Sequence, residues 1–368
     1  MHAFIPAILS LCPEIFICLA AHLWEQMQGK RGFFSPIRRG RFANCNHRSY
    51  HYLALITMKL IQAILVATFA VASTSQANNV SAQQEGSLLR ITGDGRSNWI
   101  TVRQSNAGDV TIAGANGTRV NGRPLVRFVR PEFSQAEILL GAGNDRITFI
   151  GFAVTNDLFV NLEAGNDILA TVAASPVRVG KNFRIQGEAG NDVIRLSNVT
   201  SGEDIGIEGG TGVLAASVVN SEVGKSLTVI GDLMHDSVTV SGTTAAGLVS
   251  VETKSGNDRV NLARSTANGW FVNTDAGSDR IAATLVESAE DIGLFAGTEA
   301  DLVTLVQVTA GKNLTLTLDT GNDRAFGQAV TAALDLVIEG GDGRDILTNR
   351  GISGGTKTEI KEIEVLLR

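Results

Sequence analysis

Residues 340–348, Gly340-Gly341-Asp342-Gly343-Arg344-Asp345-Ile346-Leu347-Thr348, form a glycine-rich turn that ends in an aspartate and leads directly into alternating apolar residues. This is the clearest copy of a unit that recurs through most of the chain. Weaker copies lie at residues 141–145, 164–167, 189–192, 255–258, 276–279 and 320–323. Aligned on the last residue of the turn, which we call position 0, the units fall at positions 145, 167, 192, 214, 236, 258, 279, 301, 323 and 345. The spacing is nearly constant, with one longer step between Asp167 and Asp192, and a period this regular predicts a repeat architecture.

Each unit carries two short apolar alternations. Positions +2 and +4 are apolar in most units, as in Val260 and Leu262, and so are positions −9 and −7, as in Leu314 and Leu316. Alternation of this kind is typical of strands, and no unit shows apolar residues at helical spacing. One unit cannot bury its own apolar face, whereas stacked units close a continuous core. The sequence therefore predicts an all-β fold, a parallel β-helix or β-roll solenoid of about ten 22-residue coils.

The chain divides into five segments. We interpret residues 1–57 as sequence upstream of the true translation start at Met58. Residues 58–77 have the order of a secretory signal peptide, with Lys59, an apolar run and the small-residue site Ser75-Gln76-Ala77. Residues 78–130 are predicted to form an N-terminal cap and the first coils, residues 131–350 the solenoid repeats, and residues 351–368 a C-terminal cap strand.

Irregular steps locate the caps and one insertion. Asn98 occupies position 0 of an early unit, and its distance along the chain from Asp145 predicts two coils between them. The longer step between Asp167 and Asp192 is expected to hold a bulging loop around Ala174-Ser175-Pro176. Repeat insertions of this kind belong in loops, so the stack itself is expected to continue.

Composition restricts the classes of partner. Seven basic and two acidic residues lie in the segment 1–77, so 24 basic and 35 acidic residues remain from Asn78 onward, a net charge of −11. An acidic body of this size excludes nucleic acid as the expected partner and favours cations. All three cysteines also precede Asn78, so the repeats have neither a disulfide nor a cysteine-based metal site.

The aspartate at position 0 is expected to point into the coil. It shares a strand face with positions +2 and +4, whereas position +1, which is arginine in several units, points outward. Stacking then places carboxylates above one another, and unit charges about 5 Å apart repel by roughly 0.8 kcal/mol even in water. Two explanations remain open: the carboxylates bind calcium with the carbonyls of the glycine turns, or they cap backbone N–H groups with no metal.

Residues 340–348 resemble a known family. They match the pattern GGxGxDxUx of the RTX, or hemolysin-type, calcium-binding repeats, and the shorter GxGND copies resemble degenerate relatives found in secreted bacterial proteins. The resemblance implies a parallel β-roll in which turn aspartates and glycine carbonyls of adjacent coils hold calcium. It implies the following calcium ligands, of which Asp236 and Asp301 are the weaker because their turns have lost glycines: Asp145, Asp167, Asp192, Asp236, Asp258, Asp279, Asp301, Asp323, Asp342 and Asp345.

The chain departs from that family in two ways. RTX repeats place two metal turns in every coil, whereas this chain has one strong glycine turn per repeat unit, and the fourth unit has Leu214 at position 0. A milder polar row at position −10 includes Asp157, Asn182 and Asp204. We interpret that row as turn caps and not as a second metal row.

Three functional interpretations follow from these features. The first is a secreted or cell-surface calcium-binding protein with a structural or adhesive role, whose further partner would be an extracellular polysaccharide or a cell-surface protein, with no membrane span in the mature chain. The alternative is a β-helix lyase or hydrolase acting on extracellular acidic polysaccharide, but no catalytic constellation is visible, and His235 is interpreted as a surface residue. The third, a calcium-responsive secretion signal attached to a catalytic domain, is less expected because the repeats account for most of the mature sequence.

Overall fold

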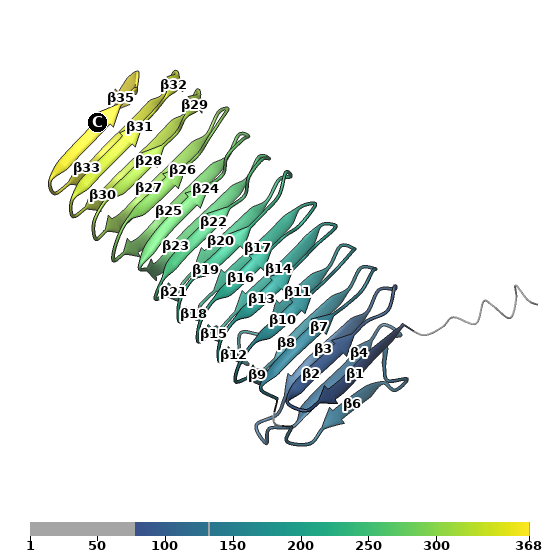
Figure 1. Ribbon diagram of the computed structural model, residues 1–368. Helices are drawn as coiled ribbons and strands as arrows, with labels where there is room; N and C mark the ends of the chain where they lie inside the picture. The colour runs from purple at the N-terminus through teal and green to yellow at the C-terminus, as the bar shows by residue number, and fades with distance from the viewer. Residues whose placement is uncertain (1–77, 132, 368) are drawn as a thin grey trace, which may run out of the picture. The chain divides into compact units, whose positions relative to one another are not determined.

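The computed structural model describes residues 78–131 and 133–367, so the proposed upstream segment and signal peptide lie outside the described residues. The described chain is a stack of strands in two large sheets (Figure 1). The first sheet has 14 strands. They are β1 (Asn79–Glu85), β2 (Leu88–Thr92), β5 (Arg119–Val120), β7 (Gln135–Leu139), β10 (Leu158–Asn161), β13 (Phe183–Gln186), β16 (Ile205–Glu208), β19 (Leu227–Ile230), β22 (Leu248–Glu252), β24 (Gly269–Asn273), β26 (Ile292–Phe295), β28 (Leu314–Thr317), β31 (Asp335–Glu339) and β34 (Lys357–Lys361).

The second sheet has 19 strands and contains the segments that follow each glycine turn. They are β3 (Trp99–Gln104), β4 (Val110–Ala115), β6 (Leu125–Phe128), β8 (Arg146–Ile150), β9 (Ala153–Val154), β11 (Ile168–Thr171), β12 (Val177–Val179), β14 (Asp192–Ser197), β15 (Val199–Ser201), β17 (Leu214–Val219), β18 (Glu222–Val223), β20 (Ser237–Ser241), β21 (Thr244–Ala245), β23 (Arg259–Ala267), β25 (Arg280–Ser288), β27 (Leu302–Ala310), β30 (Arg324–Ala332), β33 (Ile346–Gly354) and β35 (Val365–Leu367). A third sheet pairs β29 (Thr320–Gly321) with β32 (Asp342–Gly343) inside the turns.

Parallel pairing joins each coil to the next, which confirms the predicted solenoid of about 22 residues per coil, with about eleven turns. Ile292 pairs with Leu314, and Leu314 pairs with Leu336 in the following coil. The alternating positions +2, +4, −9 and −7 face inward and form one continuous buried core. Phe149 of the second sheet meets Phe183 of the first sheet edge to face, with ring centroids 6.4 Å apart. The core therefore lies between the two sheets.

The N-terminal region differs from the prediction of two coils. Strand β3 pairs directly with β8 in parallel, with Trp99 opposite Arg146, so Asn98 and Asp145 belong to neighbouring coils despite their separation of 47 residues. The additional residues leave the coil as antiparallel strands, β4 on β3 and β6 on β4. Antiparallel strands of this kind pack against the first coil of the described residues. The spacing in the sequence could not distinguish this arrangement from two regular coils.

Two other segments deviate from the regular coil. Residues 172–176 form a turn between β11 and β12, as the longer step in the spacing predicted, with the Ser175 N–H donating to the Val172 carbonyl. The C-terminal segment was predicted to be one closing strand. It is instead two strands in different sheets, β34 paired with β31 and β35 paired with β33, because the chain turns once more between them.

The bend at position +6 was not predicted, unlike the glycine turn and the corner at position −10. At position +6 the chain bends with a positive φ in most coils, at residues as different as Asn198 (56°), Leu285 (56°) and Ala329 (52°). The left-handed conformation favours glycine and asparagine, yet only some coils have them there. Among the described residues, no helix is long and apolar enough to cross a membrane.

Candidate functional site

The aspartates at position 0 form one inward row along the glycine turn, as predicted. Nine of the ten proposed calcium ligands belong to it, each at most 3% exposed, while the arginines at +1 point outward. The tenth, Asp342, lies apart: it is exposed on the outside of the turn in β32. Asp236 and Asp301 lie in the row as fully as the others, so the loss of glycines in their turns has not displaced them.

One oxygen of each aspartate accepts a backbone hydrogen bond from the preceding coil. The Asp236 N–H donates to Asp258 Oδ1 at 2.7 Å, and the Asp258 N–H donates to Asp279 Oδ1 at 2.7 Å. The row starts at the Asn98 N–H, which donates to Asp145, and ends where the Asp345 N–H donates to Glu364 Oε2. We call this row the aspartate ladder.

Leu214 interrupts the aspartate ladder at one coil. Since leucine offers no acceptor, the Asp192 N–H donates to the Val213 carbonyl at 2.8 Å instead. The Leu214 N–H still donates to Asp236 Oδ1 at 2.7 Å, so the ladder resumes at the next step. The turn therefore tolerates the loss of one carboxylate because a carbonyl replaces it.

A second row, at position −1, runs in the opposite sense. The Asn166 N–H donates to Asn144 Oδ1 and the Asn191 N–H donates to Asn166 Oδ1, so each asparagine accepts from the following coil. His235 occupies this position in its coil, and its Nδ1 accepts the Asn257 N–H at 2.7 Å. We call this row the asparagine ladder. Sequence reasoning missed it, although the repeated Asn before the turn aspartate was its visible signal.

The polar row at position −10 also caps backbone groups, as interpreted from the sequence. The Asn182 N–H donates to Asp157 Oδ1, and the Ser226 N–H donates to Asp204 Oδ1 at 2.9 Å. The same pattern continues at Asp291, which accepts both the N–H and the Nδ2 of Asn313. Three rows of side chains therefore hold successive coils together in addition to the strand pairing.

Burial dominates the electrostatics of the aspartate ladder. Loss of water raises the pKa of Asp145 and Asp192 to about 7 and that of Asp301 to about 8, while the backbone N–H bonds from the preceding coil act in the opposite direction. The pKa of Asp279 is raised to about 6 for the same reason. The second oxygens explain this preference for the neutral form, because eight of the nine Oδ2 atoms are buried without a hydrogen-bond partner.

The side chains of the aspartate ladder do not by themselves form a calcium cage. Calcium takes six to eight oxygen ligands, and one oxygen of each carboxylate already accepts a backbone N–H. Within the described ranges, no group of three or more acidic, histidine or cysteine side chains is placed to hold a metal ion. The contacts agree with the capping explanation, and the calcium assignment stays a prediction.

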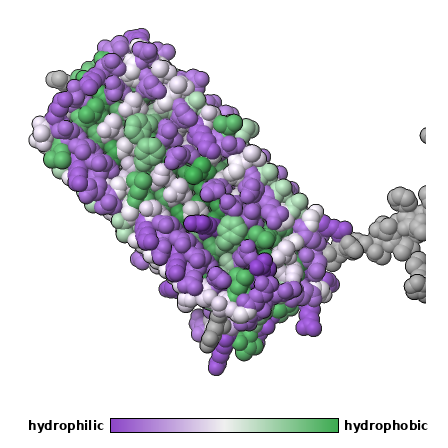
Figure 2. Space-filling model, viewed as in Figure 1, coloured by the Kyte–Doolittle hydropathy of each residue, from purple (hydrophilic) through white to green (hydrophobic). Residues whose placement is uncertain are grey.

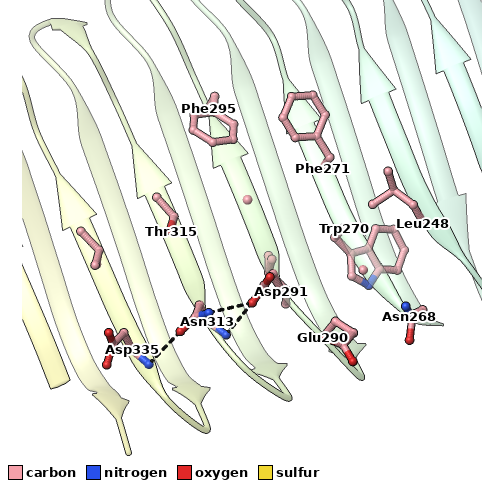
Figure 3. Close-up of a pocket in the computed structure, with 14 residues that line it drawn as sticks. Leu248, Asn268, Trp270, Phe271, Glu290, Asp291, Phe295, Asn313, Thr315 and Asp335 are labelled. Atoms are coloured by element: carbon pink, nitrogen blue, oxygen red, sulfur yellow. Dashed lines mark hydrogen bonds between the residues drawn. The ribbon is translucent and has the colours of Figure 1, made fainter. Parts of the chain in front are cut away.

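The outer face of the first sheet is hollowed in several places. One cavity, of about 760 Å³, extends from Leu248 on β22 to Val337 on β31 (Figure 3). Another hollow lies over Phe159 and Gly206 toward the N-terminal end of the same face. Figure 2 shows that apolar and hydrophilic side chains alternate in patches along the stack. Comparison with protein-family models, curated proteins and solved structures finds no match, so the likeness to RTX repeats remains a resemblance of motif.

Proposed function

We propose that this protein is an exported structural or adhesive rod, whose turn ladders stabilise the stack from within. The supporting observation is the aspartate ladder, which continues from Asn98 to Glu364 with one interruption at Leu214. Each of its rungs joins two coils through an inward side chain that the solvent does not reach. Constant geometry along the axis, combined with an outer face of varied residues, suits a protein that presents a surface and keeps its shape.

The enzyme alternative receives less support. Catalysis by general acid and base requires accessible carboxylates or a histidine beside a substrate-sized cleft. The carboxylates of the aspartate ladder are buried and hold backbone N–H groups, and His235 accepts a backbone N–H in the asparagine ladder. The carboxylates that do reach a cavity lie on the face of the first sheet, where they would repel an acidic polysaccharide.

Calcium dependence tests the proposal. The purified protein is unfolded by heat in excess chelator and in millimolar calcium, alongside an Asp258→Ala/Asp323→Ala double variant. If the aspartates act only as caps of backbone N–H groups, we expect the wild type to be equally folded in both buffers. The variant should lose the same amount of stability in each buffer. A large calcium-dependent rise in melting temperature that the variant lacks would contradict this expectation and would establish the ladder as a metal row.

Location is tested separately. We expect tagged protein to be reached by protease or antibody on intact cells, or to be found in the medium, and to lose the segment before Asn78. A Lys59→Glu/Leu65→Asp variant of the apolar run should remain inside, since it removes the features that direct export. Wild-type protein that stays in the cytoplasm would refute the exported role.

A further inference from the structure

The cavity over β22 to β31 is a groove with an aromatic floor. Phe271 and Phe295 point outward from neighbouring strands β24 and β26, and both rings are half-buried (Figure 3). Their centroids are 5.5 Å apart and their planes are inclined by 43°. A smaller cavity of about 350 Å³ shares both rings and continues the hollow toward Asp275 and Asp319. We call the two cavities together the aromatic groove.

Gly293 creates the depth of the groove. Its φ is not in the left-handed region, so the backbone does not require glycine there. A Cβ at this position would lie 3.0 Å from Cε2 of Phe295 and 3.9 Å from Cδ2 of Phe271, so it would contact both rings. The equivalent residue of the next strand is Thr315, which pairs with Gly293 in the register. The missing side chain therefore opens the sheet surface at this strand.

Carboxylates line both sides of the aromatic groove. The first cavity has Glu290, Asp291 and Asp335 along one rim, and the second has Asp275 and Asp319 along the other. None of the residues that line the two cavities is lysine, arginine or histidine. Two lysines stand just outside the lining: Lys312 pairs with Glu290 and interacts with Asp291, and Lys357 interacts with Asp335. The lining therefore presents an apolar floor between carboxylate edges, and its own charge is complementary to a cation, most directly at Asp275 and Asp319.

We propose that the aromatic groove binds a linear polysaccharide of basic amino sugars, of which a β-linked glucosamine polymer is the simplest example. The proposal rests on the adhesive role proposed above and gives it a ligand class. The bound glycan is extended and lies along the axis of the solenoid.

The floor and the rims fit the two faces of such a sugar. A pyranose ring has a flat apolar C–H face, which packs on an aromatic ring, and a polar edge of hydroxyl and amino groups, which requires acceptors. Phe271 and Phe295 provide the rings, and Asp275 and Asp319 line the same smaller cavity as those rings. Asp291 and Asn313 line the larger cavity toward the other end of the strands (Figure 3). Charge-assisted bonds from ammonium groups to the rim carboxylates add orientation.

The length of the groove fits a repeating ligand. Its lining spans five successive strands of the first sheet, β22, β24, β26, β28 and β31, which at about 4.8 Å per strand is roughly 19 Å. A chain of hexoses repeats at a distance close to that spacing, so successive sugars meet successive strands. An apolar peptide would cover the exposed carboxylates of Asp275 and Asp319 without supplying a partner, and an acidic polysaccharide would be repelled by them.

Binding is measured by titration calorimetry with a hexamer of β-1,4-linked glucosamine. We expect wild-type protein to bind it, and Phe271→Ala/Phe295→Ala to weaken binding by at least about tenfold, since two stacking contacts are lost. Gly293→Thr should weaken binding similarly by filling the hollow, and it should fold because threonine already stands at the equivalent positions Thr228 and Thr315. Phe159→Ala is the matched control, since it removes a half-buried ring from the same face outside the groove.

Several outcomes would overturn the proposal. One is the absence of hexamer binding by a protein whose circular dichroism shows the native fold. Another is unchanged affinity in both groove variants, or equal weakening by Phe159→Ala. Tighter binding of polygalacturonate, or equal binding of a lysine oligomer that does not depend on the rings, would identify a different ligand class. Failure of any of these tests leaves the exported rod intact, because the location and chelator experiments do not involve the groove.

Discussion

An inward aspartate offers two oxygens, and at every position of the row except Asp236 the turn uses only one of them. At Asp192 the Oδ1 atom accepts the Asp167 N–H at 2.9 Å, whereas Oδ2 is buried without a partner. The useful part of the side chain is an acceptor and not a charge. Asn98 occupies the same place at the start of the row without a charge: its Nδ2 donates to the Arg96 carbonyl at 2.6 Å, and its Oδ1 is buried without a partner.

The pair Asp192→Ala and Asp192→Asn separates the acceptor from the charge. Alanine leaves the buried Asp167 N–H without an acceptor and should cost about 1–3 kcal/mol of unfolding free energy. Asparagine keeps an acceptor and removes a carboxylate that burial disfavours, so its unfolding free energy should equal or exceed that of the wild type. Urea denaturation at neutral pH measures both. A loss with asparagine as large as that with alanine would mean that the charge itself is needed, as a bound cation would require.

The bend at position +6 offers a gain in stability. Leu285 is 41% exposed and has a φ of 56°, a conformation that asparagine adopts at lower cost than leucine. Leu285→Asn should raise the unfolding free energy by roughly 0.5–1 kcal/mol, measured by thermal unfolding. Leu302→Asn is the control, because Leu302 is 39% exposed but lies in ordinary strand conformation, and there asparagine should be neutral or unfavourable. Equal effects at the two sites would rule out the backbone explanation.

At the scale of the element, the aspartate ladder makes stability depend on pH. The pKa of an aspartate in the unfolded chain is about 3.9, and burial raises it in the folded chain, to about 6 for Asp167 and about 8 for Asp301. Well below about pH 3.9 both states hold the proton and there is no penalty. As the pH rises to about 8, the unfolded state ionises first, and the folded state becomes progressively less favourable.

We therefore expect the melting temperature to be higher at about pH 5 than at about pH 8.5, where the ladder must ionise. Calorimetry over that range measures the slope, and Asp301→Asn should reduce it in the upper part of the range because burial raises the pKa of Asp301 to about 8. A melting temperature that rises toward alkaline pH would show that the carboxylates are charged and compensated in the folded protein.

The elements that follow the period could be predicted from the sequence, whereas the exceptions could not. Alternation at Val260 and Leu262 specifies an inward strand face, so the fold and the inward direction of the aspartates followed from the pattern. The N-terminal antiparallel strands did not, because the 47-residue separation of Asn98 and Asp145 equals about two periods. The aromatic groove was also missed, because Phe271 and Gly293 occupy outward positions, where the type of residue does not repeat from one unit to the next.

At the scale of the described solenoid, every coil depends on its two neighbours. The ladders and the strand pairs link residues about 22 apart, and longer connections are found at the N-terminal antiparallel strands. A stack of this kind is stabilised by interfaces between adjacent coils and not by contacts across the whole domain. Complete coils are therefore exchangeable, provided that the register of the ladders is preserved.

Deletion of residues 215–236 tests this. The excision joins Leu214 to Ser237, removes one complete coil, and brings the Leu214 N–H opposite Asp258 in place of Asp236. We expect a folded, monomeric protein with a lower melting temperature and unchanged β-structure per residue, measured by circular dichroism and gel filtration. Deletion of residues 215–225 is the control, since half a coil breaks the alternation of the sheets and should prevent folding. Loss of fold in both deletions would mean that coils are not independent units.

The one-coil separation of donor and acceptor also determines which genetic changes the molecule can accept. Unequal recombination that duplicates or removes one repeat leaves every backbone N–H of the ladders opposite an acceptor in an adjacent coil. The solenoid can therefore lengthen or shorten without a compensating mutation. A point mutation of an outward residue such as Phe271 changes the chemistry of the outer surface and leaves the ladders unchanged. The length of the solenoid and the chemistry of its outer surface can therefore change separately, and selection can act on one while the other stays fixed.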